Sequence, residues 1–296
     1  LTDKEVEMMP MGALIMTLEV GLRFLTDYID GDHYFKIAYS DHNLVRARTQ
    51  LRLVADMQSK WDEMNRIVAK VAKEAQLTEK YKALYNGEVI NTGEKRLVLH
   101  QLTRGQLGDD VVVDGVNKRE FYLNELKKIG EFVNKVHNGE ITNAAGEKFT
   151  TVVQIGIGGS DLGPRAIYLA LENWAKANDT LKMNAQFISN VDPDDAAAVL
   201  SNIDVAHSLF IVVSKSGTTL ETLTNESFVK DALAKAGLDA SKHMLAVTSE
   251  TSPLAKSDDY LAAFFMDDYI GGRYSSTSGV GGVVLSLAFG PKVFTD

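Results

Sequence analysis

The chain has 296 residues, of which 45% are hydrophobic and 24% are charged, so it can bury a substantial core without disulfides or metal ions. Its net charge of -9 argues against nucleic acid or a membrane surface as a partner, because either would require a basic face. The absence of cysteine excludes disulfides and thiolate nucleophiles and fits a cytoplasmic protein, and the six histidines lack the spacing of a metal site.

The first 68 residues are predicted to form helices. Apolar residues follow helical spacing between Leu44 and Met57, and arginines occupy the other faces. The apolar stretch 8–18 is too short to span a membrane and is expected to be a buried helix. Further helices are predicted at 67–82, which a turn at Asn86-Gly87 follows, and at 120–136.

After Thr150 the sequence alternates between strand-like and helix-like segments. The strands are predicted at 152–157, 183–189, 209–213, 244–248 and 263–266. The helices are predicted at 162–177, 194–202, 219–236 and 252–258. Such alternation indicates an α/β fold with a parallel sheet covered by helices on both faces.

A glycine-rich loop follows the first of these strands, with the sequence Gly156-Ile157-Gly158-Gly159-Ser160-Asp161. Asp161 stands where a dinucleotide fingerprint needs its third glycine, and no Walker lysine follows. The glycines would let a ligand approach the backbone at the start of a helix, whose free N–H groups attract anions. A tight strand-to-helix turn without a ligand is an equally good interpretation.

A second loop carries four hydroxyls and one ammonium in six residues, Ser214-Lys215-Ser216-Gly217-Thr218-Thr219. A phosphate monoester suits this combination, because hydroxyls give directed hydrogen bonds and lysine gives charge. Helix capping is the alternative, with Thr218 as the N-cap and Glu221 reaching back. Capping does not explain the lysine and the other hydroxyls, so a phosphate site is favoured.

Arg273 follows the last strand, next to Gly271 and Gly272. An arginine at this edge could stabilise an oxyanion through two parallel hydrogen bonds, and the alternative is a surface arginine in a turn. We expect His100 to be a hydrogen-bonded core histidine, and the pair Asp267-Asp268 has no evident metal-ligand partners.

These three loops, together with Asn91-Thr92-Gly93-Glu94-Lys95-Arg96 and Leu99-His100, resemble the glucose-6-phosphate isomerase family over about residues 70–296. The resemblance implies a sugar isomerase (SIS) fold, a three-layer αβα sandwich with a five-stranded parallel sheet. It implies an SIS domain at 150–296, a helical lead-in at 69–149 and a separate helical segment at 1–68. Glucose 6-phosphate and fructose 6-phosphate would be interconverted through an enediolate, without cofactor or metal.

The same resemblance implies roles for particular residues. Arg273 would be catalytic and stabilise the enediolate, Gly159 would allow close approach of the substrate, and Glu221 would lie in the substrate site. The sugar 6-phosphate would be held by Ser160, Ser214, Lys215, Ser216 and Thr219.

In that family the proton-transfer glutamate, histidine and lysine lie in the later half of the enzyme, so this chain alone is expected to bind a sugar phosphate without turnover. A homodimer is expected for the full-length protein. The alternative is a non-catalytic SIS module that binds a sugar phosphate. Residues 1–68 resemble the C-terminal end of an aminoglycoside or sugar-kinase type phosphotransferase but lack its catalytic loop, so kinase activity is not implied.

Overall fold

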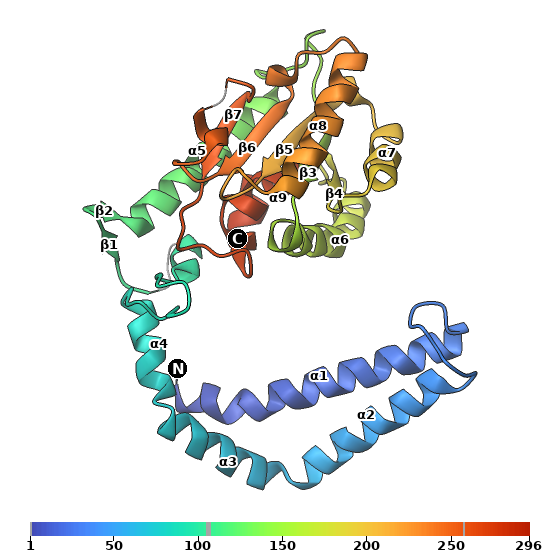
Figure 1. Ribbon diagram of the computed structural model, residues 1–296, viewed down its shortest axis with the longest axis vertical. Helices are drawn as coiled ribbons and strands as arrows, with labels where there is room; N and C mark the ends of the chain where they lie inside the picture. Colours follow the sequence, from blue (N-terminus) through green and yellow to red (C-terminus); the bar gives the residue numbers. More distant parts are fainter. Residues whose placement is uncertain (1, 105–107, 257) are drawn as a thin grey trace. The chain divides into compact units, whose positions relative to one another are not determined.

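The structure is a computed structural model that describes residues 2–104, 108–256 and 258–296. The chain divides into two compact units, Leu1–Ala83 and Leu84–Asp296 (Figure 1). Each unit has its own internal packing and is described by itself.

The first unit consists of helices, as the sequence predicts. They are α1 (Asp3–Asp30), α2 (His42–Ser59), α3 (Trp61–Glu74) and α4 (Leu77–Tyr85), of which the last runs into the second unit. The single helix predicted at 67–82 is wrong, because α3 ends before Gln76 and α4 begins after it. Gln76 has a φ of 51°, and a residue in this left-handed region interrupts the helical hydrogen bonds.

Helix α1 differs from the buried helix expected for 8–18. Met8, Met9, Ile15 and Met16 are exposed, because contact with α2 buries only one stripe of the helix, at Gly21 for example. By length and composition alone, residues Lys4–Asp30 would suffice to cross a membrane, and only 17% of the most apolar part is buried.

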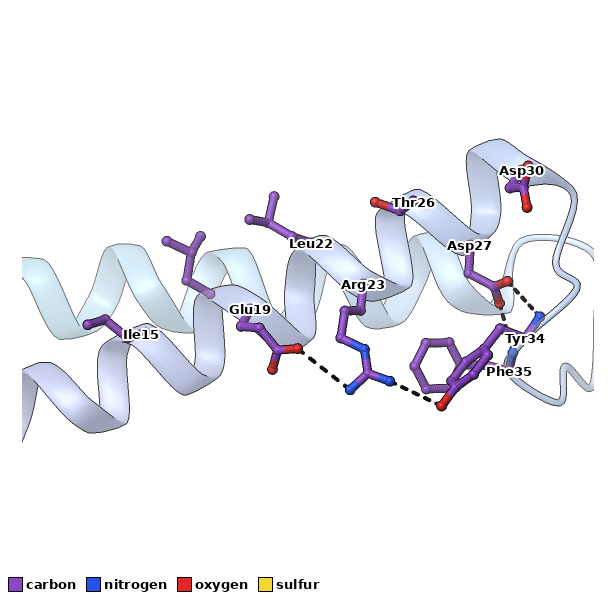
Figure 2. Close-up of a pocket in the computed structure, with 10 residues that line it drawn as sticks. Ile15, Glu19, Leu22, Arg23, Thr26, Asp27, Asp30, Tyr34 and Phe35 are labelled. Atoms are coloured by element: carbon purple, nitrogen blue, oxygen red, sulfur yellow. Dashed lines mark hydrogen bonds and ion pairs between the residues drawn. The ribbon is translucent and has the colours of Figure 1, made fainter. Parts of the chain in front are cut away.

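A cavity of about 550 Å³ lies along the exposed side of α1 (Figure 2). Its apolar wall includes Ile15 and Leu22. Several of its polar groups are paired with one another, since Arg23 lies 3.6 Å from a Glu19 carboxylate oxygen and donates to the Tyr34 hydroxyl at 3.3 Å. The cavity therefore offers a mainly apolar surface.

The second unit is built on a five-stranded parallel sheet in the order β4-β3-β5-β6-β7. The strands are β3 (Thr151–Ile155), β4 (Asn184–Ile188), β5 (Ser208–Val213), β6 (Met244–Thr248) and β7 (Ala262–Phe265). Each lies within two residues of its predicted position, because unbroken apolar runs are typical of strands buried on both faces. A short antiparallel pair, β1 (Val112–Val113) and β2 (Val116–Asn117), precedes the sheet.

Helices cover both faces of the sheet (Figure 1). On one face, Val152 and Ile211 pack against α5 (Lys118–Asn138), α6 (Leu162–Ala177) and α9 (Gly279–Phe289). On the other face, Val153 and Phe210 pack against α7 (Pro193–Ser201) and α8 (Leu220–Lys235). The structure thus confirms the α/β class and the three-layer αβα sandwich. A short helix, α10 (Pro291–Thr295), follows α9.

The helix predicted at 252–258 is the exception. A single 3-10 turn, Pro253–Lys256, stands there instead, and residue 257 lies outside the described residues. Ser252 accepts a hydrogen bond from the backbone N–H of Leu254 at 3.1 Å, a local bond that favours a tight turn over a longer helix.

His207, just before β5, lies between two acidic side chains from neighbouring loops. Its ring nitrogens lie 2.8 Å from Asp204 Oδ2 and 2.8 Å from Glu147 Oε2, and hydrogen bonds to these two carboxylates raise the pKa of His207 above 6.5. A raised pKa means that the charged pairs stabilise the fold at low pH and weaken as the pH rises through the folded-state pKa.

We therefore expect the urea midpoint of the second unit to fall slightly as the pH rises from 6.5 to about 8.5. Urea unfolding followed by tryptophan fluorescence would measure it. The His207→Gln variant should show a smaller dependence over this interval, and an equal dependence in both proteins would contradict the assignment to His207.

Candidate functional site

The order of the strands reverses direction at one point of the sheet. The chain runs from β3 to β4 on one side of β3, and then returns to β5 on the other side. The carboxyl ends of β3 and β5 therefore flank the topological switch point of the sheet. In open parallel sheets, ligands bind at such a point. The glycine-rich loop follows β3 and the hydroxyl-rich loop follows β5, so both predicted loops lie next to this point.

The glycine-rich loop is in backbone contact with the loop after β7. A Cβ atom added to Gly159 would lie 2.4 Å from the carbonyl carbon of Gly272, so only glycine fits there. Ser275 ties the same two loops, because its hydroxyl donates to Gly272 O at 2.7 Å and lies 3.3 Å from Gly159 O. The buried Gln154 side chain supports the loop by donating to Ser160 O at 2.7 Å.

The hydroxyl-rich loop is ordered by its own side chains. Ser214 is buried, donates to the Thr219 hydroxyl at 3.2 Å, and accepts a hydrogen bond from the Gly217 N–H at 3.1 Å. Gly217 has a φ of 66°, which glycine adopts at low cost. Ser216 lies at the exposed turn of the loop and accepts a hydrogen bond from the Thr218 hydroxyl at 3.0 Å.

The alternative interpretation of this loop, helix capping by Thr218, is wrong in its position. Helix α8 begins at Leu220, and its N-cap is Thr219 rather than Thr218. Thr219 makes no side-chain capping bond, because its hydroxyl is engaged with Ser214. Glu221 is exposed in the first turn of α8, and its carboxylate makes no hydrogen bond with any residue in the described ranges. Capping therefore does not account for the hydroxyls of the loop.

The loop that follows β7, residues 266–278, is called the Arg273 loop, and its backbone is strained next to Arg273. Tyr274 has a φ of 64° and is 86% exposed, and such a backbone conformation in a bulky residue costs about 1–3 kcal/mol and occurs often at functional sites. Arg273 is exposed and forms no hydrogen bond or ion pair within the described part of the chain. Its guanidinium is therefore open to an incoming anion.

Two acidic residues just after β7, Asp267 and Asp268, contact several other segments of the unit. Asp267 accepts a hydrogen bond from the Tyr122 hydroxyl at 2.8 Å and lies 3.2 Å from Lys118 Nζ. Asp268 lies 4.0 Å from Lys215 Nζ and 3.5 Å from Arg96 Nη1. The pair thus connects the end of β7 to α5, to the hydroxyl-rich loop and to the lead-in segment. These contacts join segments that are distant in the sequence, and no local sequence pattern predicts them.

The lead-in segment lies along the Arg273 loop. The N–H of Leu99 donates to Tyr269 O at 3.2 Å, His100 Nε2 lies 2.9 Å from Gly271 O, and the hydroxyls of Thr103 and Thr277 are 2.7 Å apart. His100 is thus hydrogen-bonded, as expected, but it is half-buried and not part of the core.

The structure brings together Gly159 with the Arg273 loop, and Lys215 with Asp268. Ser214 and Thr219 are hydrogen-bonded to each other inside the hydroxyl-rich loop, whereas Ser216 and Glu221 are exposed. The site offers backbone N–H groups, hydroxyls, an ammonium and a guanidinium, which together suit a small anion. In the described ranges, no group of three His, Asp or Glu side chains is placed to hold a metal ion.

Comparison with known proteins gives consistent matches. The family model described as phosphoglucose isomerase matches residues 57–296. Over 229 residues the chain is 66% identical to the glucose-6-phosphate isomerase of Treponema denticola, which covers 77% of this chain and 43% of the relative. It is 49% identical over 234 residues to that of Borreliella afzelii, covering 78% and 44%.

A solved structure agrees with these matches. The crystal structure of a glucose-6-phosphate isomerase from Chlamydia trachomatis superposes with a TM-score of 0.67 at 38% identity, covering 76% of this chain and 42% of that one. The chain therefore spans less than half the length of these relatives.

Proposed function

This chain belongs to the phosphoglucose isomerase family, and on that premise we propose that its second unit binds the phosphate group of a sugar 6-phosphate. The substrates would be glucose 6-phosphate and fructose 6-phosphate, interconverted by the whole protein. Because the chain spans 43% of its relative from Treponema denticola, the isomerase activity is proposed for a longer protein of which this chain resembles a part.

The observation that carries the proposal is the contact between Gly159 and Gly272. It joins the glycine-rich loop to the Arg273 loop at the sheet edge where α/β folds bind ligands. The phosphate would be held by the hydroxyls of Ser214, Ser216 and Thr219, by Ser160, and by the ammonium of Lys215. Glu221 would face the sugar from the first turn of α8.

Arg273 would act on the reacting end of the sugar. Moving a proton between C1 and C2 passes through an enediolate, whose oxygen carries negative charge. A guanidinium can donate two parallel hydrogen bonds to the C1 and C2 oxygens of the enediolate, and this stabilises the transition state more than the neutral substrate. The chemistry needs no cofactor or metal. The proton-transfer glutamate, histidine and lysine would come from outside these loops.

The organisation of the chain is part of the same proposal. Residues 150–296 would form the SIS domain, whose first strand begins at Thr151, and residues 69–149 would be its lead-in. Residues 1–68 would be a separate helical segment similar to a phosphotransferase tail. A cytoplasmic homodimer is proposed for the whole protein, and sedimentation equilibrium would test the dimer.

We expect Lys215→Ala to weaken fructose 6-phosphate binding by about 1–3 kcal/mol, the range for losing a hydrogen bond to a charged group. Isothermal titration calorimetry with the 296-residue chain would measure it. Lys292→Ala is the matched control, because Lys292 is 87% exposed and lies on α10, outside the three loops. Equal affinity in the Lys215 variant and the unmodified chain would mean that the phosphate binds elsewhere.

A further inference from the structure

Asp268 presents a negative charge next to the ammonium that would hold the phosphate. Its Oδ1 lies 4.0 Å from Lys215 Nζ. A carboxylate this close to an anion site is unfavourable, because like charges a few ångströms apart repel and the repulsion is only partly screened near a protein surface. Phosphate binding next to Lys215 therefore requires that the charge of Asp268 be compensated.

Arg96 is placed to supply this compensation. Its Nη1 lies 3.5 Å from the same Oδ1 of Asp268, so one carboxylate oxygen is shared by two cations. Lys215 and Arg96 carry two positive charges against the one negative charge of Asp268, which leaves one positive charge for an anion. Without Arg96, the charges of Lys215 and Asp268 would cancel.

The backbone fixes Arg96 at this position. Its N–H donates to Asn91 O at 3.1 Å and closes the turn 91–96, in which Glu94 N–H donates to the Asn91 side chain at 3.2 Å. Three residues later, Leu99 N–H donates to Tyr269 O at 3.2 Å, next to Asp268. Backbone hydrogen bonds at both ends of the segment 96–99 therefore place Arg96 beside the end of β7.

We infer that Arg96 is a positioning residue for phosphate binding: it pairs with Asp268 and so keeps the Lys215 ammonium available to a phosphate dianion. This inference rests on the proposed phosphate site and adds to it a residue outside the three loops. Arg96 acts through Asp268 and does not touch the substrate.

A merely structural role for Arg96 predicts something different. The Arg96 and Asp268 side chains are 38% and 57% exposed, and exposed ion pairs contribute little to stability. Removing the guanidinium should therefore leave the unfolding midpoint nearly unchanged. An effect on phosphate affinity without an effect on stability is the signature of the inferred role.

The test is a double-mutant cycle measured by titration calorimetry with fructose 6-phosphate on the 296-residue chain. Arg96→Gln should weaken binding about threefold to tenfold, because it leaves Asp268 uncompensated. Arg96→Gln combined with Asp268→Asn should bind within about twofold of the unmodified chain, since one positive charge is again in excess. Arg96→Lys keeps the charge and should retain most of the affinity.

The outcomes separate this inference from the proposed site. If Lys215→Ala weakens binding but Arg96→Gln does not, the phosphate site stands and the role of Arg96 is refuted. If Asp268→Asn fails to restore affinity to the Arg96 variant, the effect does not pass through Asp268 and the inference is likewise refuted. If Lys215→Ala leaves the affinity unchanged, the site itself is elsewhere. Thermal unfolding of each variant would establish that it is folded at the titration temperature.

Discussion

Replacing Gly159 with alanine is expected to damage both the fold of the second unit and its ligand site. The added Cβ would lie 2.4–2.6 Å from the carbonyl carbon, carbonyl oxygen and Cα of Gly272. Because all three atoms belong to the backbone, no side-chain rotation can relieve the clash, and one of the two loops must move. We expect the free energy of unfolding to fall by about 3 kcal/mol, the upper end of the usual range for overpacking.

The same variant should bind fructose 6-phosphate at least about tenfold more weakly, which corresponds to about 1.4 kcal/mol. The loops after β3 and β7 could no longer present Ser160 and Arg273 in their present arrangement. Urea unfolding and titration calorimetry would measure the two effects.

Gly93→Ala is the matched control for the Gly159→Ala substitution. A Cβ at Gly93 would have Asn91 Oδ1 as its nearest neighbour, at an ordinary distance of 3.7 Å. Its effect on stability should stay within about 0.5 kcal/mol, as for most surface substitutions. If the variants at Gly159 and Gly93 were equally stable, the close contact between the two loops would not exist in solution.

The contact at Gly159 also shows what the sequence could not predict. The strands and most helices of the second unit were predictable, because apolar runs such as 209–213 and helical periodicities such as 162–177 are local patterns. The loops were predictable as anion sites because glycines, hydroxyls and a lysine follow those runs directly. The approach of Gly159 to the Arg273 loop joins residues more than a hundred positions apart, and no local pattern encodes it.

Other differences have the same origin. Asp267 and Asp268 carry no motif, and their partners come from three separate segments of the unit. The N-cap of α8 lies one residue after the predicted Thr218, because a hydrogen bond between Ser214 and Thr219 competes with capping. Apolar composition alone predicted burial at 8–18, yet burial depends on which elements pack against a helix, and α1 contacts its neighbours along one stripe.

A buried ion pair at the start of α6 should be one of the most sensitive points near the site. The Asp161 side chain is only 4% exposed, and its Oδ1 lies 2.9 Å from both Nε and Nη2 of Arg165. Burial raises the pKa of Asp161 above 3.8 even though Arg165 acts in the opposite direction. A carboxyl with a raised folded-state pKa costs stability as the pH rises through its unfolded-state value, and Arg165 limits this cost.

We therefore expect Arg165→Met to lower the free energy of unfolding at pH 7 by about 3 kcal/mol, the lower end for breaking a buried pair, because Arg165 itself is one third exposed. The deficit should shrink as the pH falls towards 3.8, where Asp161 takes up a proton and needs no partner. Urea unfolding at both pH values would measure it.

The double variant with Asp161→Asn distinguishes charge from packing. It removes the buried charge, so it should recover most of the stability lost at pH 7. In the alternative outcome, the loss of stability is the same at both pH values and persists in the double variant. That result would assign it to the lost contact between Arg165 and the Phe187 ring, whose centroid is 5.3 Å away. Asp161 directly follows Ser160, so an uncompensated buried charge here should disturb the glycine-rich loop. We therefore expect weaker fructose 6-phosphate binding at pH 7 in the single variant only.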